Sequence, residues 1–196
     1  MLISSDWYPT LQRSDVELVE DPIVRVEADA VVTADGTRCE VDTIIFGTGF
    51  RTTEFLVPME VLGRDGTSIH DAWKGGARAH LGVTVPGFPN LFLLYGPNTN
   101  LAHNSIILMI ECQVRHVLAC LEQLGERGRK AIEPTAEAAE AFDAETQGRV
   151  EKTVWAAGCP SWYKNEEGRI TNNWSGSTIE FWKRTRKADW SQFRFS

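Results

Sequence analysis

The chain has 196 residues, of which 42% are hydrophobic and 24% charged, so it can bury a core, and disordered, collagen-like and low-complexity proteins are excluded. Lysine and arginine number 20 against 27 acidic residues, and the resulting net charge of −7 does not favour nucleic-acid binding through bulk electrostatics. No stretch approaches the roughly 20 apolar residues of a membrane span, and the start of the chain lacks the basic and apolar regions of a signal peptide.

The N-terminal part predicts short strands. Apolar and β-branched residues gather in VELV (16–19), IVRV (23–26) and AVVTA (30–34). The dipeptide Asp35-Gly36 follows the third run, and Asp-Gly between alternating runs is typical of a β-hairpin.

Two continuous apolar runs predict strands that are buried on both faces. The first, VDTIIF (41–46), ends in Gly47-Thr48-Gly49, and the second, NLFLLY (90–95), ends in a glycine as well. Residues 51–89, between the two runs, are rich in glycine and proline and predict loops.

Two helices are expected in the C-terminal half. Apolar residues recur at helical spacing over 105–124, with Asn104 or Ser105 as the N-cap and Gly125 beyond the end. A second helix opens near Pro134-Thr135 and covers the strong helix formers of 135–147.

The cysteines indicate a reducing compartment. The chain has no C-x-x-C pair, and Cys112 and Cys120 lie eight residues apart in one predicted helix, about 12 Å, too far for a disulfide. Free thiols, no metal site and a cytoplasmic location are therefore expected.

The ends of the two apolar runs predict a cofactor crevice. Glycine at a strand end lets a ligand approach the backbone, and a helix N-terminus offers unpaired N–H groups and partial positive charge. Because ligands bind at the carboxyl ends of strands in open α/β sheets, residues 47–49 and 96–105 would line this crevice. An ordinary strand–loop–helix corner is the alternative.

These residues resemble a known family. VDTIIFGTGF is similar to the "ATG"-type motif of flavin-containing monooxygenases, and GVTVPGFPNLFLLYGPNTNLAHNSIILMIECQVRHV resembles a C-terminal segment of class B flavoprotein monooxygenases. The likeness is strongest to the Baeyer–Villiger branch, in particular the 4-hydroxyacetophenone monooxygenase-like group, and it covers almost the whole chain. The GPNTN-x-x-HNS stretch argues against another type of FAD/NAD(P)-dependent reductase.

The resemblance implies an α/β fold that forms part of a flavoprotein with two dinucleotide-binding domains. Residues 1–40 would end the NADP-binding domain, and residues 41–196 would complete a Rossmann-like FAD-binding domain and its C-terminal cap. The implied enzyme uses FAD and NADPH. It inserts one oxygen atom of O2 into a ketone, or adds it to nitrogen or sulfur, of a small organic substrate.

Several parts of that enzyme are absent from the sequence. No G-x-G-x-x-G occurs, the Baeyer–Villiger fingerprint F-x-G-x-x-x-H-x-x-x-W/D is missing, and so is the family's Lys-Arg pair, which would precede Met1. We therefore expect a C-terminal portion that is inactive alone, carries no catalytic residue and associates with itself through exposed strand edges. A non-catalytic binding or interaction module derived from this fold is the alternative.

The resemblance also assigns site residues. The cofactor-binding positions are Thr48, Gly49, Asn98, Asn100, Leu101 and Ala102, the last four mostly through backbone groups. Helix capping is the alternative for that loop. Trp162 matches a tryptophan near the NADP ribose and the substrate, and an aromatic side chain that fills a loop-rich core is its alternative.

Overall fold

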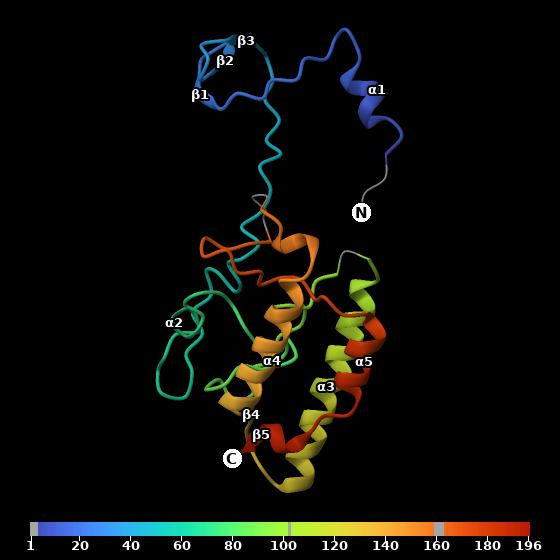
Figure 1. The fold of residues 1–196 in the computed structure, drawn as a ribbon. Coiled ribbons are helices and arrows are strands. Elements are labelled where there is room, and N and C mark those ends of the chain that lie inside the picture. Colours follow the sequence, from blue (N-terminus) through green and yellow to red (C-terminus); the bar gives the residue numbers. More distant parts are fainter. Residues whose placement is uncertain (1–3, 102, 159–162) are drawn as a thin grey trace. The chain divides into compact units, whose positions relative to one another are not determined.

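The computed structural model describes residues 4–101, 103–158 and 163–196. The chain forms two compact units, Met1–Gly49 and Phe50–Ser196 (Figure 1). Each is described by itself below.

The first unit contains helix α1 (Trp7–Leu11) and a three-stranded antiparallel sheet in the order β1-β2-β3. The strands are β1 (Ile23–Val26), β2 (Ala30–Thr33) and β3 (Arg38–Glu40). The predicted hairpin at Asp35-Gly36 is confirmed, because it joins β2 to β3. The Asp35 carboxylate accepts hydrogen bonds from the Thr33 and Thr37 hydroxyls, which lowers the pKa of Asp35 to about 2.

Two predicted strands of this part are absent. Residues 16–19 and 41–46 have no regular structure, so both predictions are wrong for this chain. The second run was expected to be buried on both faces, yet Ile45 is 90% exposed and Phe46 is 80% exposed. A strand of a parallel sheet forms only beside partner strands, and the described residues supply none here.

The second unit is mainly helical. Its helix α3 packs against α5, with the two side by side in Figure 1. A two-stranded antiparallel sheet joins residues near the C-terminus to the segment before α4. The elements are α2 (Ile69–Ala72), α3 (Ile106–Arg127), β4 (Ile132–Pro134), α4 (Ala136–Val150), a 3-10 turn (Val154–Ala156), α5 (Thr178–Arg186), a second 3-10 turn (Trp190–Gln192) and β5 (Phe193–Phe195).

Both long helices begin where the sequence predicts. The Ser105 hydroxyl accepts a hydrogen bond from the Leu108 N–H at 3.3 Å, and the Thr135 hydroxyl caps α4 in the same way. The predicted C-terminal end of α3 is wrong, because Gly125 lies inside the helix. The helix ends at Gly128 instead, whose φ of 60° is left-handed.

The second apolar run, 90–95, is not a strand either. Only an isolated bridge between Phe92 and Thr84 remains, and Asn90 and Tyr95 have left-handed φ values of 59° and 58°, which interrupt extended backbone. The unit thus mixes helix and strand as expected, but the named strands among the described residues pair antiparallel rather than as a parallel Rossmann sheet.

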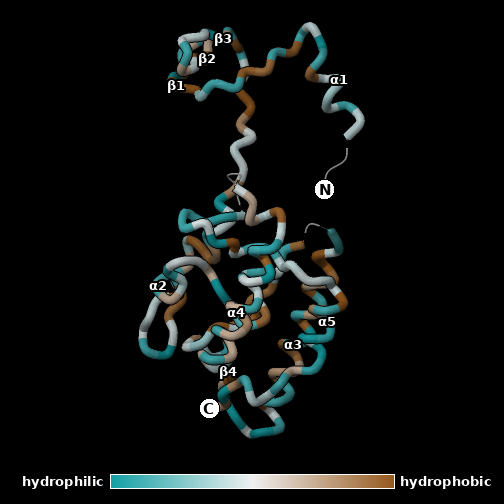
Figure 2. The backbone as a smooth tube through the Cα atoms, viewed as in Figure 1, coloured by the Kyte–Doolittle hydropathy of each residue, from teal (hydrophilic) through white to brown (hydrophobic). Residues whose placement is uncertain are grey.

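Helix α3 carries apolar side chains on two opposite faces. Hydrophobic residues recur along its length in Figure 2. One face lies in the cores of the second unit and includes Met109, Cys112, His116 and Cys120. The other face is exposed and includes Ile107, Val114, Leu118 and Leu121. No helix among the described residues is both long and apolar enough to cross a membrane.

Candidate functional site

The predicted cofactor loop is bound along its length to a second segment of the chain. The Asn98 N–H donates to the Thr171 carbonyl at 2.7 Å, and the Asn100 N–H donates to the Asn172 carbonyl at 2.9 Å. In return, the Trp174 N–H donates to the Asn100 carbonyl at 2.8 Å. Asn98 and Asn100 are therefore fixed by backbone hydrogen bonds to residues 171–174.

The Asn98 side chain holds the same two segments together. It is buried, and its Nδ2 donates to the carbonyls of Ile170 and Asn173, both at 3.0 Å. Its backbone φ of 56° is left-handed, a conformation that asparagine tolerates better than most residues do. In this structure the Asn98 carboxamide therefore holds the loop in shape.

Asn100 is held from two sides. Its Oδ1 accepts a hydrogen bond from the Tyr95 hydroxyl at 2.9 Å, and its Nδ2 donates to Asn173 Oδ1 at 2.8 Å. Burial, and secondarily the neighbouring Tyr163, raise the pKa of the Tyr95 phenol, so that its hydroxyl keeps the proton it donates.

Leu101 anchors the C-terminal end of the loop in the hydrophobic core. Its side chain is buried in a cluster with Leu81, Met109 and Trp174, so only its backbone is suited to a ligand contact. A close backbone approach fixes the other end of the loop, because a Cβ on Gly96 would lie 2.3 Å from the Gly82 carbonyl oxygen.

A cavity of about 190 Å³ lies beside this loop. Its lining combines aromatic rings with carboxamides: Thr52, Phe55, Tyr95, Gly96, Asn100, Tyr163 and Asn172. Ligand pockets usually span ~300–1,000 Å³, so this one accommodates a ring-sized part of a cofactor rather than a dinucleotide.

The other predicted site residues are placed differently. Thr48 and Gly49 belong to the first unit, where a Cβ on Gly49 would meet no heavy atom within 4 Å, so this backbone is open to a ligand. The convergence of these two residues with the loop stays a prediction. Ala102 and Trp162 lie outside the described residues.

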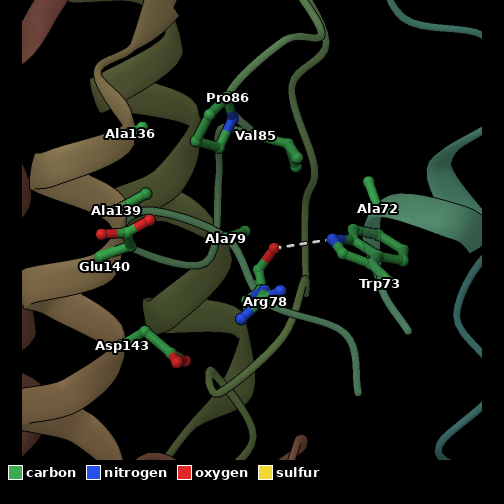
Figure 3. Close-up of a pocket in the computed structure, with 10 residues that line it drawn as sticks. All are labelled: Ala72, Trp73, Arg78, Ala79, Val85, Pro86, Ala136, Ala139, Glu140 and Asp143. Atoms are coloured by element: carbon green, nitrogen blue, oxygen red, sulfur yellow. Dashed lines mark hydrogen bonds between the residues drawn. The ribbon is translucent and has the colours of Figure 1, made fainter. Parts of the chain in front are cut away.

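A second cavity, of about 210 Å³, lies elsewhere in the second unit (Figure 3). The Trp73 indole forms one wall and donates to the Arg78 carbonyl at 2.8 Å. Figure 3 shows Glu140 and Asp143 on α4 at the opposite side. The residues predicted from sequence do not line it, and its mixture of acidic and basic groups favours no single ligand charge.

Sequence reasoning missed three residues that organise the site. Gln113 lies on the buried face of α3, and its Oε1 accepts a hydrogen bond from the Tyr95 N–H at 2.8 Å. Tyr95 and Asn173 then hold Asn100. A glutamine on the apolar face of a helix was the one available signal, since buried polar side chains need partners.

No protein-family model matches the chain. Curated relatives do. A Baeyer–Villiger monooxygenase of Streptomyces coelicolor is 40% identical over 196 residues, which cover 99% of this chain and 38% of that protein. An FAD-binding monooxygenase of Aspergillus niger is 41% identical over 198 residues, with 98% of this chain and 32% of that protein covered.

Solved structures match as well. The OTEMO complex with FAD and NADP aligns with a TM-score of 0.86 at 27% identity, over 99% of this chain and 37% of that one. Oxidized steroid monooxygenase bound to NADP aligns with a TM-score of 0.82 at 29% identity, over 97% and 37%. The chain thus spans less than two fifths of the length of these proteins.

Proposed function

We propose that this chain, which is related to a C-terminal portion of the flavin-dependent Baeyer–Villiger monooxygenases, contributes that portion to an FAD- and NADPH-dependent monooxygenase. The reaction would insert one oxygen atom of O2 into a ketone, or add it to nitrogen or sulfur, of a small organic substrate. The names of the relatives and the identity of 40% over nearly the whole chain support the class of reaction.

The observation that carries the cofactor assignment is a hydrogen-bonded loop a few residues before a long helix. Residues 96–101 are fixed by hydrogen bonds, and the 22-residue helix α3 begins at Ile106. A helix N-terminus bears roughly half a positive charge, which stabilises an anion nearby, such as a reduced flavin ring. When bound, FAD supplies the centre at which O2 is reduced.

The residues of this chain fit part of that cofactor. The cavity beside Asn100 has the size of a ring, and its aromatic and carboxamide lining suits the edge of a flat heterocycle. In this proposal Asn98, Asn100, Leu101 and Ala102 shape one side of the flavin site, and Thr48 and Gly49 contact it through open backbone. Trp162 would lie near NADP and the substrate.

The proposal assigns residues 1–40 to the end of an NADP-binding domain and residues 41–196 to the C-terminal part of a Rossmann-like FAD-binding domain. The exposed apolar face of α3 supports a need for further polypeptide, since a helix that is apolar on opposite sides is normally covered on both. The proposal places the chain in a reducing, cytoplasmic setting, where the thiols of Cys39, Cys112 and Cys120 would stay free.

Activity measurements test this proposal. The chain alone, mixed with FAD and NADPH, is expected to consume NADPH no faster than free flavin does. A chimera in which this chain replaces the matching portion of the Streptomyces relative is expected to bind FAD and oxidise NADPH, with the truncated relative as the control. Turnover by the chain alone, or a folded chimera without flavin, contradicts the proposal.

A non-catalytic interaction module is the second candidate. It is favoured by the second unit having buried apolar clusters of its own. A purified chain that is monomeric and cooperatively folded, together with a flavin-free chimera, would support this alternative.

A further inference from the structure

We propose that Tyr95 is a positioning residue, which fixes the carboxamide of Asn100 in one orientation at the loop assigned above to the flavin. The inference rests on the proposed function for its ligand. The geometry of Tyr95, Asn100 and their partners stands independently of it.

Tyr95 is itself held in an unfavourable conformation. Its φ of 58° lies in the left-handed region, which a bulky residue rarely adopts. The Tyr95 N–H donates to Oε1 of Gln113 at 2.8 Å, and Gln113 is fully buried on α3. Residues in such conformations persist where the surrounding structure over-determines them, and they gather at functional sites.

The two ends of the Asn100 carboxamide have different partners. The Tyr95 hydroxyl donates to Oδ1 at 2.9 Å, and Nδ2 donates to Oδ1 of Asn173 at 2.8 Å. Asn173 is fully buried, so its side chain has little room to move away from this contact. A half-turn of the Asn100 amide would set its oxygen against the Asn173 oxygen, and the Tyr95 hydroxyl would have to accept a hydrogen bond instead of donating one. The observed pair of hydrogen bonds is therefore made only in this orientation.

This orientation matters because Tyr95 and Asn100 both line the cavity of about 190 Å³. A ligand ring that enters the cavity meets an amide whose polar groups are set in advance, and preorganised groups lose less entropy on binding. Without the hydroxyl, one of the two restraints on the amide is lost. Tyr95 therefore acts through Asn100 rather than by a reaction of its own.

Nuclear magnetic resonance of the 15N-labelled chain tests the restraint without any ligand. Tyr95→Phe removes only the hydroxyl, and Tyr8→Phe, at an exposed site in the first unit, is the matched control. The expected result in Tyr95→Phe is a shift of the Asn100 side-chain NH2 resonances and faster exchange of their hydrogens. The backbone amides of Asn98 and Asn100 should stay protected. Unchanged Asn100 resonances, or the same change in the control, would overturn the proposal.

Gln113→Leu provides a second variant. It keeps an apolar side chain on the buried face of α3 and removes the acceptor for the Tyr95 N–H, so the Asn100 NH2 resonances are expected to move as in Tyr95→Phe. If Gln113→Leu does not fold, Tyr95→Phe still decides the outcome, because the Tyr95 side chain is 47% exposed and its hydroxyl can be removed without opening a core.

Riboflavin titration, followed by flavin fluorescence, separates this proposal from the proposed function. Riboflavin is chosen because it needs no pyrophosphate loop. The expected result for Tyr95→Phe is about two- to tenfold weaker binding, the value of one hydrogen bond. If the Asn100 resonances shift but riboflavin binds to neither protein, the restraint on Asn100 stands and the flavin assignment fails. Equal binding of riboflavin to both proteins would overturn the claim that the orientation of Asn100 favours the ligand.

Discussion

His80 and His116 are both buried, and each ring lies beside the ring of Phe193. The ring centroids are 5.5 Å apart for His80 and Phe193 and 5.9 Å apart for His116 and Phe193. Burial, and secondarily the neighbouring His116, lower the pKa of His80 to about 4, and burial also lowers the pKa of His116. Both histidines are therefore neutral in the folded chain near pH 7.

The lowered pKa of His80 predicts a loss of stability in mild acid. An unfolded histidine titrates near pH ~6.5, so between that pH and about 4 the unfolded state binds more protons, and the free energy of unfolding falls as the pH falls. We expect a loss on the order of 1–2 kcal/mol between pH 7 and pH 5 from His80. Urea unfolding at both pH values, followed by tryptophan fluorescence, measures it.

His80→Leu is expected to reduce this pH dependence, because leucine cannot be protonated. His103→Gln, at an exposed position, is the control for replacing a histidine. An equal loss of stability with pH in His80→Leu and the unaltered chain would show that other groups are responsible.

At the scale of elements, the loop of the candidate site depends on two glycines that touch. A Cβ on Gly96 would meet the Gly82 carbonyl oxygen at 2.3 Å and the Leu93 Cβ at 3.0 Å, and a backbone carbonyl cannot easily move aside. Gly96→Ala is expected to lower the free energy of unfolding by about 1–3 kcal/mol and to disturb the hydrogen bonds of residues 96–101.

Gly148→Ala is the opposite case and serves as the control. Gly148 lies inside α4, and a Cβ there would meet no heavy atom within 4 Å. Alanine should stabilise the helix by roughly 0.5–1 kcal/mol, because glycine loses more backbone entropy on folding. Denaturant unfolding of the two variants should therefore give changes of opposite sign, and a neutral Gly96→Ala would mean that the loop is not held by this contact.

The elements that could be predicted from sequence are those fixed by neighbouring residues. The cap at Ser105, the helix start near Thr135 and the turn at Asp35-Gly36 each depend on residues within a few positions, and all three are confirmed. The runs 41–46 and 90–95 have the composition of buried strands, but a strand also needs partners, which the described residues do not supply.

The distance along the chain between interacting residues also decides which parts of the site could be predicted. The loop at 96–101 could be expected from its glycine and asparagines, and the backbone of that loop is indeed fixed in place. Gln113 contacts Tyr95, which lies 18 residues away along the chain, and Asn173 contacts Asn100, which lies 73 residues away. The spacing of residues in a motif does not reveal contacts between segments so far apart.

At the scale of the whole molecule, the exposed face of α3 predicts self-association. Ile107 is 70% exposed and Leu118 is 53% exposed, and both lie on a face opposite the buried one. Contiguous apolar surface of this kind normally marks an interaction site. We expect concentration-dependent association in sedimentation velocity, and a reduction in the double variant Ile107→Glu/Leu118→Lys. A monomeric unaltered chain at micromolar concentration would contradict this.

Segment 41–50 is where we expect proteases to cleave the chain. It has no regular structure, and Phe46 and Phe50 are 80% and 86% exposed, so chymotrypsin, which cuts after large apolar residues, should cleave after both. In the proposed enzyme the same segment would pair with strands supplied by further polypeptide and lose this exposure. Mass spectrometry of timed digests should therefore show rapid cleavage in the chain alone and much slower cleavage in the chimera with the Streptomyces relative. A peptide bond must leave regular pairing before a protease can bind it, so equal rates in the two proteins would mean that the segment stays unpaired and that this part of the proposed domain does not form.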